Sequence, residues 1–127
     1  MKRRVFGVLV VMLSSAAGAL AHHSFAAAYR EDQKVKLEAE IVQVSFRNPH
    51  SFVQIMAKDE KGVMQKWSIE WGAAAQLAQQ GVSRNDLKPG DKVIVTADPS
   101  RDPTDHRLRM RTIERPSDGW KYGGNFD

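Results

Sequence analysis

Two adjacent histidines, His22 and His23, follow an apolar N-terminal run and directly precede Ser24 and Phe25. If the chain is cut after Ala21, His22 becomes the first residue and carries a free α-amine beside its imidazole. The amine and the imidazole of one residue can chelate a transition metal, and nitrogen donors of this kind suit copper(II) and zinc. The sequence therefore predicts a metal-binding terminus in the processed protein.

The first 21 residues have the pattern of a cleaved signal peptide. Lys2, Arg3 and Arg4 form a basic start, residues 5–20 are mainly apolar, and residues 19–21 give the small-x-small pattern that signal peptidases read. The apolar run has 16 residues, fewer than the roughly 20 that span a bilayer. We expect residues 1–21 to be removed and residues 22–127 to be periplasmic or secreted, without a membrane anchor. A retained anchor is the alternative.

Removal of this leader changes the charge of the protein. The whole chain has 19 Lys and Arg residues against 15 Asp and Glu residues, and the loss of Lys2, Arg3 and Arg4 leaves 16 against 15, a net charge of about +1. This near-neutral balance, together with export, disfavours a nucleic-acid partner. The chain has no cysteine, which excludes disulfides and thiolate metal ligands. The remaining 106 residues suit a single small domain.

Alternating apolar residues predict a mainly β fold with one short helix. The expected strands cover residues 35–46, 51–57, 63–71, 92–97 and 108–112, and the helix covers residues 73–80 and ends at Gly81. A slip in phase at Val42 indicates a β-bulge in the first strand. Residues 98–105 form a polar loop, and residues 116–127 form a loose tail in which Trp120 and Tyr122 are candidates to pack back.

Three strands, a helix and two further strands is the order of a small OB-like five-stranded barrel. Ligands of such barrels usually contact strands two and three and the loops that join strands one to two and four to five. Asn48, Pro49 and His50 fall in the first of these loops, and His106 closes the second. Trp67 and Trp71 share the phase of the third strand's apolar face and are expected in the core.

The turn between the second and third strands fixes a candidate site. A three-residue turn with Gly62 in the left-handed conformation pairs Phe52 with Glu70 and makes His50 the diagonal neighbour of Glu70. A register slip of one residue would separate the two side chains. The candidate metal ligands are His22, His23, His50 and Glu70, with copper or zinc as the cofactor. The alternative is that these residues form no site. The terminal histidines would then be frayed, His50 would only satisfy backbone groups of its turn, and Glu70 would lie on the solvated side of its strand.

A stripe of three arginines follows the last predicted strand. Arg107, Arg109 and Arg111 alternate with apolar residues, so they share one face and could bind an anion such as a carboxylate or phosphate. Asn48 at the barrel rim is a further candidate ligand-binding residue. The alternative is the charged outer face of an ordinary alternating strand.

The mature chain resembles an exported bacterial family, domain of unknown function 6152. Chains of that family open with His-His-Ser-Phe and later carry Asn-Pro-His at the start of a strand. The matching positions are residues 22–25 and 48–50, with a Trp-x-x-Glu stretch at 67–70 and a Leu-Lys-Pro-Gly-Asp turn at 87–91. The resemblance covers nearly the whole mature chain and implies no activity, substrate or cofactor. His106 lies outside the shared motifs, so it is not part of the core site.

Three functions remain open for this chain. The first is a small exported binding domain that holds copper or zinc through its terminal histidines and the Asn-Pro-His loop. The second is a metal-free module that binds an envelope protein or a small ligand at the same rim. The third is a copper oxidase with a histidine brace from His22 and His50. The sequence has no serine, histidine and acid arrangement and no phosphate-binding loop, so we do not expect an enzyme.

Processing after Ala21 is directly testable. N-terminal sequencing of the exported protein is expected to read His-His-Ser-Phe, because residues 19–21 supply the cleavage pattern. A start at Ala19, or an uncleaved chain, would rule out the chelating terminus.

Overall fold

Five strands close into a barrel, and a sixth short strand extends one edge. The computed structural model describes residues 25–124, so the predictions for the signal peptide, His22 and His23 lie outside the described residues. The elements are β1 (Val35–Ser45), β2 (Ser51–Lys58), β3 (Met64–Trp71), α2 (Ala74–Gln79), β4 (Lys92–Pro99), β5 (Arg107–Arg115) and β6 (Trp120–Gly123). None of the helices in this part of the chain is long and apolar enough to cross a membrane.

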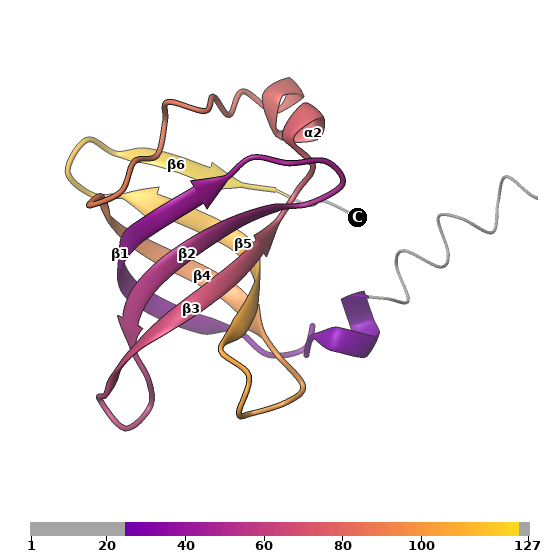
Figure 1. Ribbon diagram of the computed structural model, residues 1–127, viewed down its shortest axis with the longest axis vertical. Helices are drawn as coiled ribbons and strands as arrows, with labels where there is room; N and C mark the ends of the chain where they lie inside the picture. The colour runs from indigo at the N-terminus through magenta and orange to yellow at the C-terminus, as the bar shows by residue number, and fades with distance from the viewer. Residues whose placement is uncertain (1–24, 125–127) are drawn as a thin grey trace, which may run out of the picture.

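The barrel is closed by one parallel pairing among antiparallel ones. β1 pairs with both β2 and β4, β2 pairs with β3, and β4 pairs with β5, all antiparallel. β3 and β5 run parallel, with Ser68 opposite Arg107, and complete the circuit visible in Figure 1. The register of β1 against β2 shifts between Ile41 and Gln43, which confirms the bulge at Val42. The predicted mainly β, OB-like five-stranded barrel is therefore confirmed.

The β2–β3 hairpin has the predicted turn and register. The amide of Asp59 donates to the carbonyl of Val63 at 2.8 Å, and Asp59 Oδ1 accepts the amide hydrogens of Lys61 and Val63, each at 2.9 Å. Gly62 has a φ of 77°, a left-handed conformation that favours glycine. Phe52 consequently lies opposite Glu70, as the sequence predicts.

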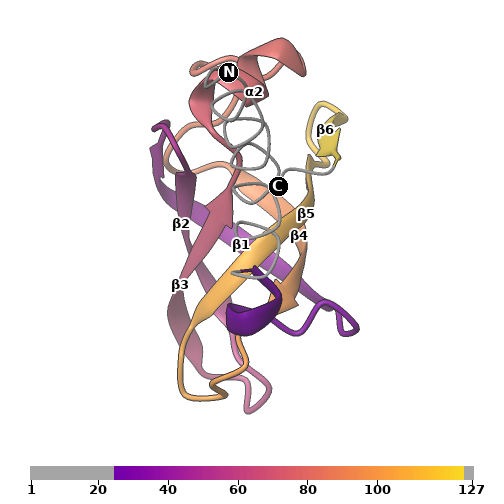
Figure 2. The ribbon, with the colours of Figure 1, turned by 90° about the vertical axis from the view of Figure 1, so that its right-hand side faces the viewer.

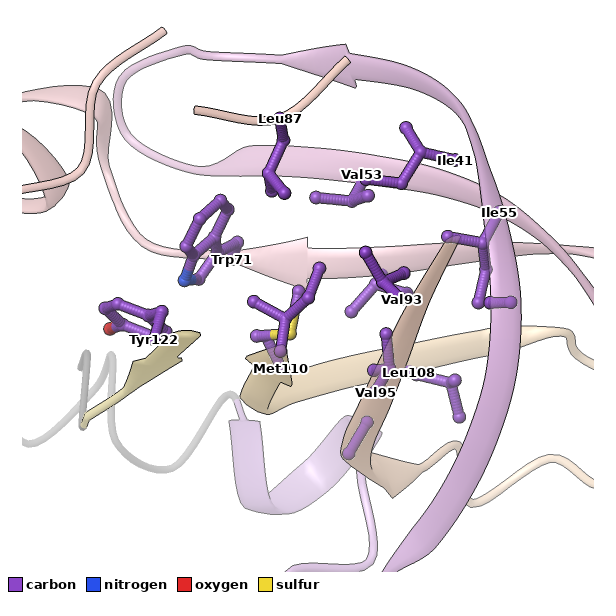
Figure 3. Packing of buried hydrophobic residues seen from close by; sticks show 14 of the residues in the cluster. Ile41, Val53, Ile55, Trp71, Leu87, Val93, Val95, Leu108, Met110 and Tyr122 are labelled. Atoms are coloured by element: carbon purple, nitrogen blue, oxygen red, sulfur yellow. The ribbon is translucent and has the colours of Figure 1, made fainter. Parts of the chain in front are cut away.

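Alternate residues of every barrel strand point inward and form one core. Figure 3 shows the central members, which are Ile41, Val53, Ile55, Trp71, Val93, Val95, Leu108 and Met110. Helix α2 covers one end of the barrel, where its Leu77 is fully buried, and the chain leaves the helix at Gly81 with a φ of 86°. Trp71 is fully buried as predicted, whereas Trp67 is half-buried and its ring lies 4.7 Å from that of His106.

Two segments differ from the predictions. β4 continues to Pro99, so Asp98 is a fully buried strand residue rather than part of a polar loop. The tail is not loose over residues 120–123, because these form β6 against β5. Tyr122 of this strand packs edge-on against Trp71 with ring centroids 5.0 Å apart, and its hydroxyl donates to Gln80 at 2.9 Å. A four-residue strand is too short to show alternation, which explains why its sequence gives no strand signal.

Truncation of Leu77 tests the role of α2 as the barrel cap. Leu77→Ala is expected to lower the free energy of unfolding by about 2–5 kcal/mol, because it leaves a cavity under the helix. Leu37→Ala, at a half-buried position of β1, is the matched control and should lower the free energy of unfolding by less. Urea denaturation of both variants measures the difference, and equal losses would show that α2 is not a packed cap.

Candidate functional site

A carboxylate on the outer face of the barrel is almost completely covered. Glu70 lies between Ile69 and Trp71, whose side chains face the core, so its own side chain is directed to the outside. Only 9% of Glu70 is nevertheless exposed. The cover comes from the N-terminal segment, residues 25–34, whose first turn lies across β5 in Figure 2. Burial of a charged carboxylate costs free energy unless both of its oxygens have hydrogen-bond or ion-pair partners.

Both oxygens of Glu70 are contacted by side chains from outside β3. The hydroxyl of Tyr29 donates to Oε2 at 2.5 Å. Nδ1 of His50 lies 2.6 Å from Oε1. A guanidinium nitrogen of Arg107 lies 4.0 Å from Oε2. We call these four residues the Glu70 cluster. The structure thus brings His50 and Glu70 together as the predicted register requires, and adds Tyr29, which sequence reasoning missed.

The contact with Glu70 determines which nitrogen His50 can offer to a ligand. A nitrogen and a carboxylate oxygen 2.6 Å apart must share a proton, so Nδ1 carries it. In the neutral imidazole the other nitrogen, Nε2, then has the lone pair. The side chain of His50 is 36% exposed. Carboxylates that bind one imidazole nitrogen in this way commonly orient histidines that ligate a metal through the other nitrogen.

Phe25, the first described residue, packs directly beside His50. Its ring centroid lies 5.3 Å from that of His50, and the guanidinium of Arg109 lies 4.1 Å from it on the ring face. Phe25 is 3% exposed and Arg109 is 2% exposed. Arg109 also forms an ion pair with Glu31 at 2.6 Å. A cation over an aromatic face is favourable, and more so when water is excluded. The N-terminal segment is therefore anchored at both Phe25 and Glu31.

Backbone contacts fasten the same segment to the end of β4. The amide of Arg30 donates to the carbonyl of Pro99 at 2.8 Å, and the amide of Arg101 donates to the carbonyl of Ala28 at 3.0 Å. Lys34 forms an ion pair with the buried Asp98 at 2.8 Å. The chain from Phe25 onward is thus held on the barrel.

The predicted anion-binding residues have different surroundings. Arg109 forms an ion pair with Glu31 of the N-terminal segment, and Arg111 lies 2.5 Å from Asp98. Arg107 has the most exposed side chain of the three, at 52%. Asn48 accepts a hydrogen bond from the amide of Ala75 at 3.3 Å, which ties the β1–β2 loop to the first turn of α2.

Within residues 25–124 no three His, Asp or Glu side chains form a group that could hold a metal ion. His106 stacks on Trp67 and does not join the Glu70 cluster. The two described candidates, His50 and Glu70, are in contact with each other. The other two predicted ligands, His22 and His23, lie outside the described residues.

The model of a family of unknown function, DUF6152, matches residues 10–109 of the chain. This match agrees with the resemblance drawn from the sequence motifs. No curated protein and no solved structure matches the chain.

The two tyrosines of the chain provide a test of this packing. Burial and the adjacent Glu70 carboxylate raise the pKa of Tyr29 above its ordinary value of about 10, and burial raises the pKa of Tyr122. The folded state therefore favours the neutral phenols, and this contribution to stability is present below pH 10 and is lost as the pH rises above it.

Phenolate absorbance is accordingly expected at a higher pH in the folded protein than in urea-unfolded protein. Tyr29→Phe isolates the titration of Tyr122, and circular dichroism checks that the fold persists. If Tyr29 ionised near pH 10 in the folded protein, the buried contact with Glu70 would be contradicted.

Proposed function

The chain belongs to the DUF6152 family, and we propose that it is an exported metal-binding module that holds copper(II) or zinc between its mature N-terminus and His50. The observation that carries this proposal is the position of His50, which Glu70 holds by one imidazole nitrogen while Phe25 packs against its ring. The position of Phe25 supports the proposal because residues 22–24 are joined to it through the backbone.

Covalent connectivity places the proposed terminal ligands within reach of His50. Successive α-carbons are about 3.8 Å apart, so the α-carbon of His22 lies within about 11 Å of that of Phe25. The ring of Phe25 lies 5.3 Å from that of His50. After cleavage at Ala21, the amine and imidazole of His22 could therefore approach Nε2 of His50 without any rearrangement of the barrel.

The proposed donor atoms are all nitrogens, which suits copper(II) or zinc. His22 supplies an amine and an imidazole nitrogen, and His50 supplies Nε2. Three nitrogen donors suit a tetragonal copper(II) site or a tetrahedral zinc site, in each case with a further position for another ligand. His23 offers a further imidazole nitrogen of the same kind.

Glu70 has a different role in this proposal from the ligand that its sequence position suggested. One of its oxygens accepts the hydroxyl hydrogen of Tyr29 and the other contacts His50. A carboxylate with both oxygens engaged is better suited to orient the imidazole than to bind the metal. Glu70 and Tyr29 are thus positioning residues for His50.

Removal of the His50 imidazole tests the proposal. His50→Ala in protein that begins at His22 is expected to weaken copper(II) binding at least tenfold, because Nε2 is lost from the donor set. His106→Ala is the matched control, since it also deletes a histidine imidazole but one that lies against Trp67 outside the Glu70 cluster. Calorimetric titration at pH 7 gives the affinities.

Two further comparisons determine what the barrel contributes. A synthetic peptide with the sequence of residues 22–29 offers the same terminal donors without His50, so it should bind copper about as weakly as His50→Ala. Glu70→Gln should lower the affinity about 10- to 100-fold with His50 in place, and thermal melting of the metal-free variant checks its fold. Equal affinity in the protein, the peptide and both histidine variants would favour the metal-free interaction module instead.

A further inference from the structure

We propose that a groove on the outer face of the barrel binds a small amphiphilic cation, a molecule with an apolar body and one ammonium or guanidinium group. The groove has a volume of about 580 Å³ and lies over β1, β2, β4 and the start of β3. Pockets for small molecules commonly have this size. Met64 at the first position of β3 lines the groove, whereas Glu70 lies near the end of that strand, so this site is separate from the Glu70 cluster.

Strand pairing brings the residues of the groove together. Glu40 of β1 lies opposite Met56 of β2 on one side and opposite Lys92 of β4 on the other. Glu38 of β1 lies opposite Ile94 of β4. These residues alternate along their strands with members of the core, so their side chains point away from it. The groove is thus built from three strands that the barrel places side by side.

The groove has an apolar lining that is open to solvent. Met56 and Ile94 are half-buried, and Met64 is 53% exposed. Pro116, directly after β5, lines the same groove. Methionine has three rotatable bonds and a polarizable sulfur, so its side chain adapts to apolar groups of different shape. A ligand with an apolar body would remove these side chains from water, which is favourable.

The charged residues of the groove favour a cation. They are Glu38, Glu40 and Lys92, which together carry a net charge of −1. Lys92 forms an ion pair with Glu40. Within residues 25–124, Glu38 takes part in no such pair. A carboxylate accepts strong hydrogen bonds from an ammonium or guanidinium group. Glu38 is therefore the acid that is available to the charged group of a ligand.

The strand pairing also favours a small molecule over a peptide. A peptide commonly binds a sheet by adding a strand at a free edge. β1, β2 and β4 each have a neighbouring strand on both sides, so the sheet has no free edge along these three strands. A ligand in the groove must therefore be held by side chains, through apolar contact with the methionines and charge pairing with Glu38.

Methionine methyl NMR provides a direct test with hexylammonium as the probe. Hexanol and hexanoate are the neutral and anionic probes of the same chain length, and the titrations are made at pH 7, at fixed ionic strength and with a metal chelator. Of the three methionines in residues 25–124, Met56 and Met64 line the groove and Met110 is fully buried in the core. Hexylammonium should shift the signals of the first two alone and should bind more tightly than either other probe.

Two charge variants should change the affinity for hexylammonium in opposite directions. Glu38→Gln is expected to weaken binding about two- to fivefold, as for the loss of an exposed ion pair. Lys92→Gln should strengthen binding by a similar factor, because it leaves Glu40 without its partner. Asp32→Asn is the control, since it removes an exposed acid from the turn before β1 and should leave the affinity unchanged.

The contrary outcomes are specific to each part of the proposal. Equal affinities for hexylammonium and hexanol, or equal effects of Glu38→Gln and Asp32→Asn, would overturn the preference for a cation. Unshifted signals of Met56 and Met64 would overturn the groove as a binding site, and so would an equal shift of Met110, because the probe would then perturb the core. The chelator keeps these results independent of whether the proposed metal site exists.

Discussion

The buried carboxylate of Glu70 is the constraint on which the candidate site depends. Glu70 occupies an outward position of β3 and yet is nearly covered, so it needs partners that its own strand cannot supply. Tyr29 arrives from the N-terminal segment and His50 from the β1–β2 loop. The removal of one partner from such a buried charge costs far more than the net worth of the contact. The need for a partner at each oxygen of Glu70 therefore accounts both for the docking of the N-terminal segment and for the orientation of the His50 imidazole.

The ion pairs under the N-terminal segment determine its position more than they stabilise it. The attraction in partly buried pairs such as Arg109 with Glu31 roughly balances their desolvation cost, so these pairs contribute little net free energy. The favourable energy comes instead from the rings of Phe25 and Tyr29, each almost fully buried, at about 1.5–3 kcal/mol for a side chain of the size of Phe25. Apolar burial thus holds the segment on the barrel, and charge pairing fixes where it lies. The proposed ligand His22 precedes this segment in the chain by three residues.

Local patterns predicted the parts of the structure that depend on neighbours in the sequence. The hairpin register followed from the turn at Gly62, and the contact of His50 with Glu70 followed from that register. The contact of Tyr29 with Glu70 joins residues 41 positions apart, and no periodicity in the N-terminal segment or in β3 indicates it. Asp98 was misassigned for a related reason, because a charged residue beside a proline has the composition of a loop until its partners Lys34 and Arg111 are known.

The most direct test of the central claim is a crystal structure of protein that begins at His22, grown with copper(II), with anomalous scattering measured at the copper edge. We expect one strong peak at bonding distance from Nε2 of His50 and from the amine of His22, with Glu70 still in contact with Nδ1. A peak bonded to Glu70, or a copper ion held by the terminal histidines away from His50, would contradict the account.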